Sequence, residues 1–295
     1  MHAPSENPVA SRHEPATGAP FSVALALTSM GSDAEGTEIF GATLGSSWTI
    51  GPKAHGGMLL ALCANAALVA LGVDGVQPLA VSASYLSPPD PGEVQLRATL
   101  RKRGRTVSLV DVELRQGERA AVRATVTLGP PESGEALFER EHPMQSMPTE
   151  PPPDAVDVSK HPLGEIVHVA RVCELRTDPS TAAYLRGEVA TDPAIRLWVK
   201  PKGEDADALF ALLAGDVAPP VTLNLGRLGW APTVQLTALL RAQPAPGWLR
   251  VQMSTNRVGN TWFDGDATVI DSAGTLVCQA RQLAMAPAAV PASTT

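Results

Sequence analysis

The chain has 295 residues, of which 44% are hydrophobic and 18% are charged, a composition typical of a globular protein with one large domain or two ordinary ones. Its net charge of −7 argues against nucleic acid as a partner, because binding to phosphates requires a basic face. The three cysteines, Cys63, Cys173 and Cys278, are far apart and show no Cys-x-x-Cys spacing. We therefore expect reduced thiols in a cytoplasmic protein, without a metal site or a disulfide.

The two ends of the chain differ in composition from the rest. Residues 1–20 are polar and proline-rich, and they lack the basic and apolar segments of a secretion signal. Residues 288–295 are mostly alanine, serine and threonine. We expect both ends to be disordered tails. The longest apolar run, residues 58–71, is too short to span a bilayer and predicts a buried helix instead of a membrane span.

The first half of the chain combines this apolar helix with alternating segments. His55-Gly56-Gly57 precedes the helix and Gly72 ends it. A helix without a polar face must be covered on most sides. Residues 21–26 and 37–44 resemble short strands, and segments with one apolar face follow the helix at residues 95–101, 110–114 and 122–128. We predict an α+β unit over residues 21–129, with a curved antiparallel sheet wrapped around the helix.

A second unit, predicted over residues 161–287, repeats this pattern after a proline-rich linker at residues 130–160. Pro91-Gly92 matches Pro246-Gly247, and Gly104-Arg105-Thr106 matches Gly259-Asn260-Thr261, both at an offset of 155 residues. A shared offset at two turns indicates two copies of one unit. Strands are expected at residues 234–241, 248–255, 261–270 and 276–285. We therefore predict two curved antiparallel sheets, each wrapped around a long apolar helix.

An acidic residue distinguishes the two copies. The second helix, predicted over residues 205–220, carries Asp216 on the same stripe as Leu209, Leu212 and Leu213. At the offset of 155, the first copy has Ala61 in its place. A carboxylate on a buried stripe is costly unless it is paired or used in chemistry. The alternative is that the helix ends before Asp216, whose side chain then simply reaches water.

Several motifs together support a family resemblance. They are His55-Gly56-Gly57-Met58 and residues 84–92 in the first half, and residues 213–220, 232–237 and 280–284 in the second. With these motifs the chain resembles the double hotdog acyl-CoA thioesterases of the thioesterase II type, over residues 20–130 and 160–287. The resemblance implies a double hotdog fold, an acyl thioester substrate, no cofactor, and a homo-oligomer.

The resemblance also implies a set of site residues. In that family a helix aspartate, a threonine and a glutamine hold the water that attacks the thioester. By position these would be Asp216, Thr233 and Gln282. If the second copy carries two extra residues near residue 273, Gln282 corresponds to Thr125 of the first copy. The chain departs from the better known members after the threonine, where Gln235-Leu236 replaces Asp-His.

The residues themselves suggest the chemistry of thioester hydrolysis. Asp216 could act as a general base on water or as a nucleophile, and the sequence leaves both routes open. The start of the first helix offers free N–H groups and a positive dipole end for a developing oxyanion. We expect the donor to be the N–H of Gly57 or Met58, next to His55 and Gly56; alternatively, the two glycines only turn the chain into the helix.

Two other functions remain open from sequence alone. One is a non-catalytic acyl-CoA binding module, and the other is a hotdog protein acting on a carrier-protein-bound acyl chain in biosynthesis. The Gly-x-Ser-x-Gly elbow, the phosphate-binding loops and the Asp-x-Asn-x-x-His signature of hotdog hydratases are absent. Thioester hydrolysis is therefore the predicted activity.

Overall fold

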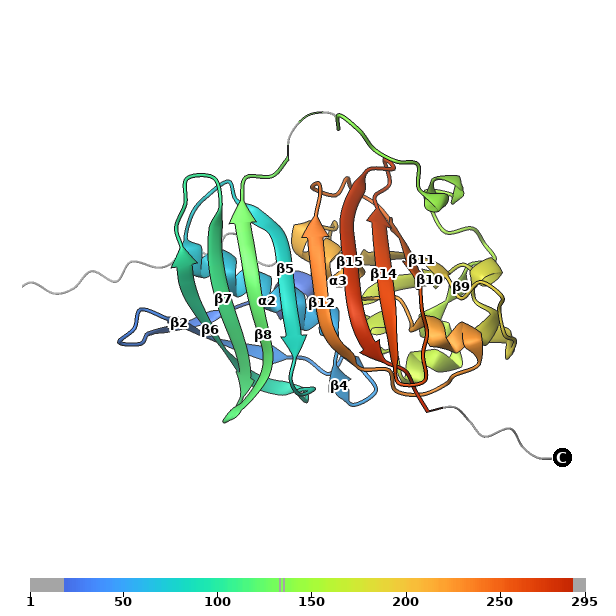
Figure 1. Ribbon diagram of the computed structural model, residues 1–295, viewed down its shortest axis with the longest axis horizontal. Coiled ribbons are helices and arrows are strands. Elements are labelled where there is room, and N and C mark those ends of the chain that lie inside the picture. Colours follow the sequence, from blue (N-terminus) through green and yellow to red (C-terminus); the bar gives the residue numbers. More distant parts are fainter. Residues whose placement is uncertain (1–18, 133, 135, 289–295) are drawn as a thin grey trace, which may run out of the picture.

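A computed structural model describes residues 19–132, 134 and 136–288, and one continuous antiparallel sheet runs through it (Figure 1). The thirteen strands follow the order β1-β2-β6-β7-β8-β5-β12-β15-β14-β13-β11-β10-β9. Their bounds are β1 Thr28–Ser32, β2 Glu38–Leu44, β5 Gln77–Tyr85, β6 Gly92–Lys102, β7 Ser108–Gln116, β8 Arg119–Gly129, β9 Val156–Asp157, β10 Cys173–Thr177, β11 Ile195–Pro201, β12 Thr233–Leu240, β13 Leu249–Ser254, β14 Trp262–Ile270 and β15 Leu276–Met285. A separate two-stranded hairpin consists of β3 (Thr49–Ile50) and β4 (Lys53–Ala54).

The two halves of the sheet join where β5 pairs with β12. Ser82 lies opposite Thr237, and their hydroxyl oxygens are 3.0 Å apart. The two residues are 155 positions apart, the offset that the turn motifs predicted. Equivalent strands of the two copies therefore pair with each other. The predicted pair of separate sheets was wrong, because β5 and β12 would each be an open edge and instead satisfy each other's backbone groups.

The first apolar helix is confirmed as α2 (Gly56–Leu71), which lies behind the sheet and is mostly buried. Gly72 ends it in the left-handed conformation, with φ of 60°. The second helix is not long: α3 covers only Ala208–Ala214. Its N-cap Asp207 accepts a 2.7 Å hydrogen bond from the Phe210 N–H, and the Pro219-Pro220 pair cannot continue a helix. The long second helix predicted over residues 205–220 was therefore wrong.

The N-terminal part of the described chain also differs from its prediction. Residues 20–24 form helix α1 (Pro20–Ala24), not a strand. Its first turn is held by Glu204, whose carboxylate accepts a 2.8 Å hydrogen bond from the Phe21 N–H. This partner is 183 residues away, so no local pattern indicates it. Most of the predicted tails, residues 1–18 and 289–295, lie outside the described residues.

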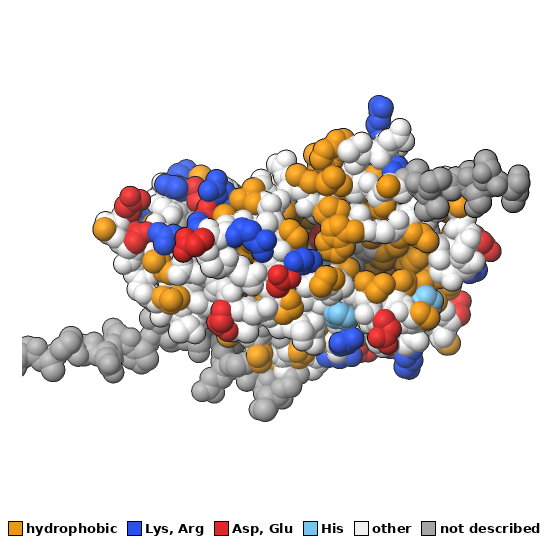
Figure 2. All heavy atoms as spheres, turned by 90° about the horizontal axis from the view of Figure 1, so that it is seen from below, with side chains coloured by type: hydrophobic (Ala, Val, Ile, Leu, Met, Phe, Trp, Pro, Cys, Tyr) orange, Lys and Arg blue, Asp and Glu red, His pale blue; other side chains and the backbone are white. Residues whose placement is uncertain are grey.

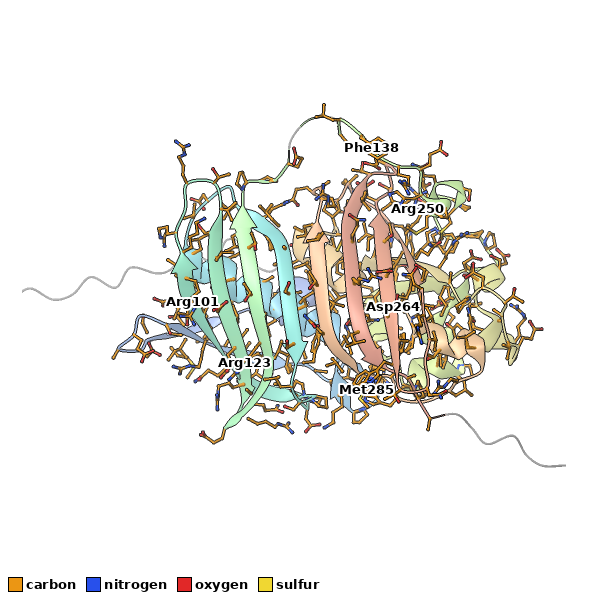
Figure 3. The ribbon with its side chains drawn as sticks, viewed as in Figure 1. Arg101, Arg123, Phe138, Arg250, Asp264 and Met285 are labelled. Carbon is orange, nitrogen blue, oxygen red and sulfur yellow. The ribbon has the colours of Figure 1, made fainter. Side chains whose placement is uncertain are left out.

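The proline-rich segment is partly folded onto the second half. It contains the 3-10 turn η1 (Pro143–Ser146) and strand β9. The buried guanidinium of Arg250 donates to the carbonyl oxygens of Met147 (3.0 Å) and Asp271 (2.7 Å), and Figure 3 shows Arg250 beside this segment. Met144 and Met147 complete a small second core with Trp198, Trp248 and Ile270. Residues 130–160 are thus more than a surface linker.

Candidate active site

Asp216 lies two residues beyond α3 and against the first turn of α2. A Cβ atom added to Gly56 would stand 2.6 Å from Asp216 Oδ2, and one added to Gly57 would stand 3.1 Å from Asp216 Cβ. Any larger residue at these two positions would collide with the aspartate. The Gly57 N–H donates a hydrogen bond to the carboxylate. The structure therefore brings an acid from the second half onto the helix start of the first half.

The environment of Asp216 favours its neutral form. Burial raises the pKa of its carboxyl to about 7, and the hydrogen bond from the Gly57 N–H opposes this rise. Among the described residues no charged side chain contributes to this pKa. The residue keeps some solvent-accessible surface, so water can reach it even though desolvation dominates. A carboxyl with these properties can exchange a proton near neutral pH.

His55 contacts both the start of α2 and Asp216. Its side chain is 5% exposed, and Nδ1 accepts a 3.3 Å hydrogen bond from the Met58 N–H. The imidazole also makes a hydrogen bond to the backbone of Asp216. Burial lowers the pKa of His55 to about 4, so the ring is neutral at pH 7. His55 is thus the N-cap of α2, and its imidazole also contacts the backbone of Asp216. Its Nδ1 lone pair accepts the Met58 N–H and is not available as a base.

The N–H groups at the start of α2 can be accounted for one by one. The Gly57 N–H points to Asp216, and the Met58 N–H points to His55. Of the two donors that the sequence suggested for an oxyanion, the Met58 N–H has His55 Nδ1 as its acceptor and the Gly57 N–H lies beside the Asp216 carboxylate. The Leu59 N–H bonds the His55 carbonyl. In the part of the chain that the structure describes, the Gly56 N–H is left without an acceptor.

Sequence reasoning assigned no role to Tyr85, which ends β5 beside these groups. Its hydroxyl donates a 2.9 Å hydrogen bond to the Gly56 carbonyl, and its ring atoms lie 3.5 Å from the Cβ position of Gly56. Burial raises the pKa of the Tyr85 phenol well above its ordinary value, and the nearby Asp216 charge adds to the rise. The phenol therefore stays protonated. The sequence motif Ser84-Tyr85 was visible, but nothing in it pointed to the helix start.

Thr233 and Gln282 form a second pair. The Thr233 hydroxyl donates to Gln282 Oε1 at 2.6 Å. A register shift in β12 between Thr233 and Gln235 moves Thr233 off the outer face that strict alternation would give it. Gln282 is 9% exposed, and its Nε2 donates to no protein acceptor among the described residues. This amide is available to a water molecule or a ligand.

Asp216 and the Thr233–Gln282 pair lie on the inner side of the sheet in the second half, since Gly215, next to Asp216, packs against the inner face of β15. A Cβ added to Gly215 would meet Ala280 Cβ at 3.1 Å, and Gln282 is the next inward-facing residue of β15. By strand register Gln282 corresponds to Val126, not to Thr125, because Arg281 and Thr125 occupy equivalent pairs. The sequence correspondence was one residue off.

The lower face of the molecule is partly apolar. Met285 lies at the lower end of β15 in Figure 3, and from below the molecule shows a hollow lined with hydrophobic side chains (Figure 2). Two large apolar residues that stay exposed are close in sequence to candidate site residues. They are Leu86, which follows Tyr85, and Trp230, which comes three residues before Thr233. Two other hollows, both lined by Met30, Gly41 and Glu93, contain none of the candidate site residues.

The described residues lack two kinds of feature. They contain no group of three His, Cys, Asp or Glu side chains placed to hold a metal ion. They also contain no helix that is long and apolar enough to cross a membrane.

Family profiles match both halves of the chain. The acyl-CoA thioesterase N-terminal domain matches residues 44–129, and the acyl-CoA thioesterase C-terminal domain matches residues 144–286. The chain belongs to the acyl-CoA thioesterase family. Within this family, uncharacterized proteins from Mycobacterium tuberculosis and Mycobacterium bovis are each 48% identical to it over 291 residues. Those alignments cover 91% of this chain and 98% of each relative.

Solved structures confirm the hotdog fold of this thioesterase family member. A candidate thioesterase II from Thermobifida fusca YX superposes with a TM-score of 0.78 at 27% identity, covering 92% of this chain and 99% of that one. A hotdog protein of unknown function from Alicyclobacillus acidocaldarius gives 0.75 at 20% identity, with coverage of 92% and 99%. An acyl-CoA thioesterase II from Mycobacterium marinum gives 0.64 at 12% identity, with coverage of 94% and 99%.

Proposed function

We propose that the protein hydrolyses acyl thioesters, with acyl-CoA as the substrate and free fatty acid and CoA as the products. The observation that carries the proposal is the placement of Asp216. It is a desolvated carboxyl with a pKa of about 7 at the start of α2, and no cation among the described residues contributes to that pKa. The helix start and the Gly57 N–H stabilise the ionised form only in part, because burial still raises the pKa to about 7, the range that a general base needs near the working pH.

In the proposed reaction the ionised Asp216 takes a proton from a water molecule. The water oxygen attacks the thioester carbonyl carbon, and the carbonyl oxygen becomes an oxyanion. The free Gly56 N–H at the positive end of α2 is the donor that we assign to this oxyanion. When the carbon–sulfur bond breaks, the thiolate leaves with the proton held by Asp216.

Thr233 and Gln282 would position the attacking water. Because the Thr233 hydroxyl occupies Gln282 Oε1, the amide of Gln282 must present Nε2 to the site. That N–H group can donate to the water oxygen while Asp216 accepts the water proton. This arrangement orients the water for attack and does not require either residue to change its charge.

An alternative route gives Asp216 the role of nucleophile, with a mixed anhydride that water then hydrolyses. The geometry around Gly57 is compatible with both routes. A carrier-protein-bound acyl chain is a second candidate substrate, and the 27% identical candidate thioesterase II supports hydrolysis without distinguishing the carriers. A pure binding module is disfavoured by the cost of a largely desolvated carboxyl that a binder does not need.

We further propose a cytoplasmic homo-oligomer. The buried free thiols of Cys63, Cys173 and Cys278 support a reducing compartment. The self-association is expected from the family resemblance and is measured by light scattering on the purified protein.

The test of the proposed function is release of free thiol from acyl-CoAs of two to eighteen carbons, with the matched acyl-pantetheine series alongside. We expect release that depends on protein concentration and saturates with substrate. Binding of acyl-CoA without thiol release from any member of the panel would favour the binding module instead.

A further inference from the structure

One peptide group links Tyr85 to Asp216. The carbonyl of Gly56 and the N–H of Gly57 belong to the same peptide unit. The carbonyl accepts the 2.9 Å hydrogen bond from the Tyr85 hydroxyl. The N–H lowers the pKa of Asp216, whose Cβ lies 3.1 Å from the Cβ position of Gly57 and whose Oδ2 lies 2.6 Å from the Cβ position of Gly56. The three groups therefore form a continuous chain of hydrogen bonds from β5 through the start of α2 to the acid.

We propose that Tyr85 is a positioning residue that acts on Asp216 through the Gly56–Gly57 peptide group. It holds the orientation of this peptide and strengthens its N–H as a donor to the ionised carboxylate. The effect on Asp216 stands on the contacts of this peptide group, and only its consequence for the reaction rate depends on the proposed thioester hydrolysis.

Two physical reasons support this role. A donor on the carbonyl oxygen polarises the peptide group, and this makes its N–H a stronger donor. The peptide also joins two glycines in the first turn of α2, where the backbone has more freedom than at other residue types and a helix end is least constrained, so an external donor adds to its orientation. Neither glycine can be replaced by a stiffer residue, because Asp216 and the Leu213 carbonyl leave no room for a side chain.

The other titratable groups around this chain do not change charge near neutral pH. His55, before α2, has its pKa lowered to about 4 by burial. Cys63 of α2 and Cys278 of β15 have theirs raised to about 12 by burial. Tyr85 itself stays protonated. Any titration in this cluster between pH 5 and pH 9 therefore belongs to Asp216.

The experiment compares Tyr85→Phe with Tyr184→Phe, a matched control because Tyr184 on η6 (Ala183–Arg186) is the only other tyrosine. Carboxyl-carbon NMR titration follows Asp216 in each variant, with Asp216→Asn identifying the signal. We expect the Asp216 midpoint to rise by about 0.5 in Tyr85→Phe, since one polarising bond is lost. The control should keep the wild-type midpoint. An unchanged midpoint in folded Tyr85→Phe overturns the proposal.

A second measurement does not depend on the stability of the phenylalanine variant. Replacing both tyrosines with 3-fluorotyrosine gives a more acidic phenol, and we expect it to lower the Asp216 midpoint; a rise would overturn the proposal. If the protein hydrolyses thioesters, Tyr85→Phe should also lose about threefold in rate below the midpoint and little well above it. If no thioester is hydrolysed, the proposed function fails while the NMR titration still decides the role of Tyr85.

Discussion

The hydroxyl oxygens of Ser82 and Thr237 lie 3.0 Å apart at the join between β5 and β12, and the two residues are equivalent positions of two copies. The backbone is therefore nearly symmetric about this pair, while the candidate site is not. Gln282 has Val126 as its counterpart. Asp216 has alanine, whether the copies are compared at the turn offset (Ala61) or at the helix N-caps (Ala64). We therefore expect one site per chain.

The raised pKa of Asp216 predicts how stability depends on pH. Its folded-state pKa of about 7 is above the unfolded value near 3.8, so the folded state binds an extra proton between these values. Its stabilising contribution is full below about pH 4 and is lost as the pH rises to 7. We expect Asp216→Asn to be about 1–4 kcal/mol more stable than wild type at pH 8, with little difference at pH 4.

Urea denaturation of both proteins at the two pH values checks this prediction. Because the same set of other acids titrates in both proteins, the difference between them isolates Asp216. Equal denaturation midpoints at pH 8 would contradict the raised pKa of Asp216.

Gly57→Ala tests the contact between the halves. The new Cβ would stand 2.8 Å from the Leu213 carbonyl oxygen and 3.1 Å from Asp216 Cβ, so α2 and the aspartate must move apart. We expect a loss of about 1–3 kcal/mol in the free energy of unfolding and a strong fall in activity. Gly45→Ala is the control, because its Cβ would meet only Trp48 at an ordinary 3.6 Å. A Gly57→Ala protein with wild-type stability and rate would show that the two groups are not in contact.

Thr233→Val tests the orientation of the Gln282 amide. Without the hydroxyl donor the amide can rotate and place Oε1 toward the water, and this removes the N–H donor from the site. We expect the rate of thioester hydrolysis to fall roughly tenfold to a hundredfold, with an unchanged fold. Thr237→Val, on the outer face of the same strand, should retain the rate. Steady-state kinetics on one acyl-CoA compare the two, and equal rates would exclude Thr233 from the site.

Arg250→Met tests the attachment of the proline-rich segment. The substitution removes the guanidinium that donates to the carbonyl of Met147, and the carbonyl of Asp271 keeps only the 3.1 Å hydrogen bond from the Gly274 N–H. We expect a loss of about 2–4 kcal/mol in stability, and activity per folded molecule should be retained. Arg123→Met, whose side chain is 67% exposed beside Glu113, should cost less than about 1 kcal/mol. Chemical denaturation measures both, and equal losses would mean that the segment contributes nothing through Arg250.

Local patterns predicted the parts of the fold that depend on local chemistry. The alternation of residues 276–285 matches β15 at both ends, and the apolar run at residues 58–71 lies within α2. The position of α1 was missed because its cap, Glu204, comes from the other half of the chain. The short α3 was overestimated because leucine spacing says nothing about where a helix ends.

The candidate site was predictable by residue type but not by geometry. Asp216 and Gln282 stood out as polar residues on apolar faces. Thr233 points inward only because of a register shift in β12, which the sequence does not reveal. Gln282 was matched to the wrong residue of the first copy, because an alignment error of one residue exchanges the two faces of a strand. No role for Tyr85 could be predicted, because the hydrogen bond of its hydroxyl is to the backbone carbonyl of Gly56 on another element.

The most direct test of the account is thiol release by Asp216→Asn, which keeps the size of the side chain and removes its charge. Wild type and variant are compared on the best acyl-CoA at pH 8, after circular dichroism has shown that both are folded. We predict that the variant loses at least about a thousandfold in rate while it still binds acyl-CoA. A folded variant that releases thiol at the wild-type rate would contradict the central role of Asp216.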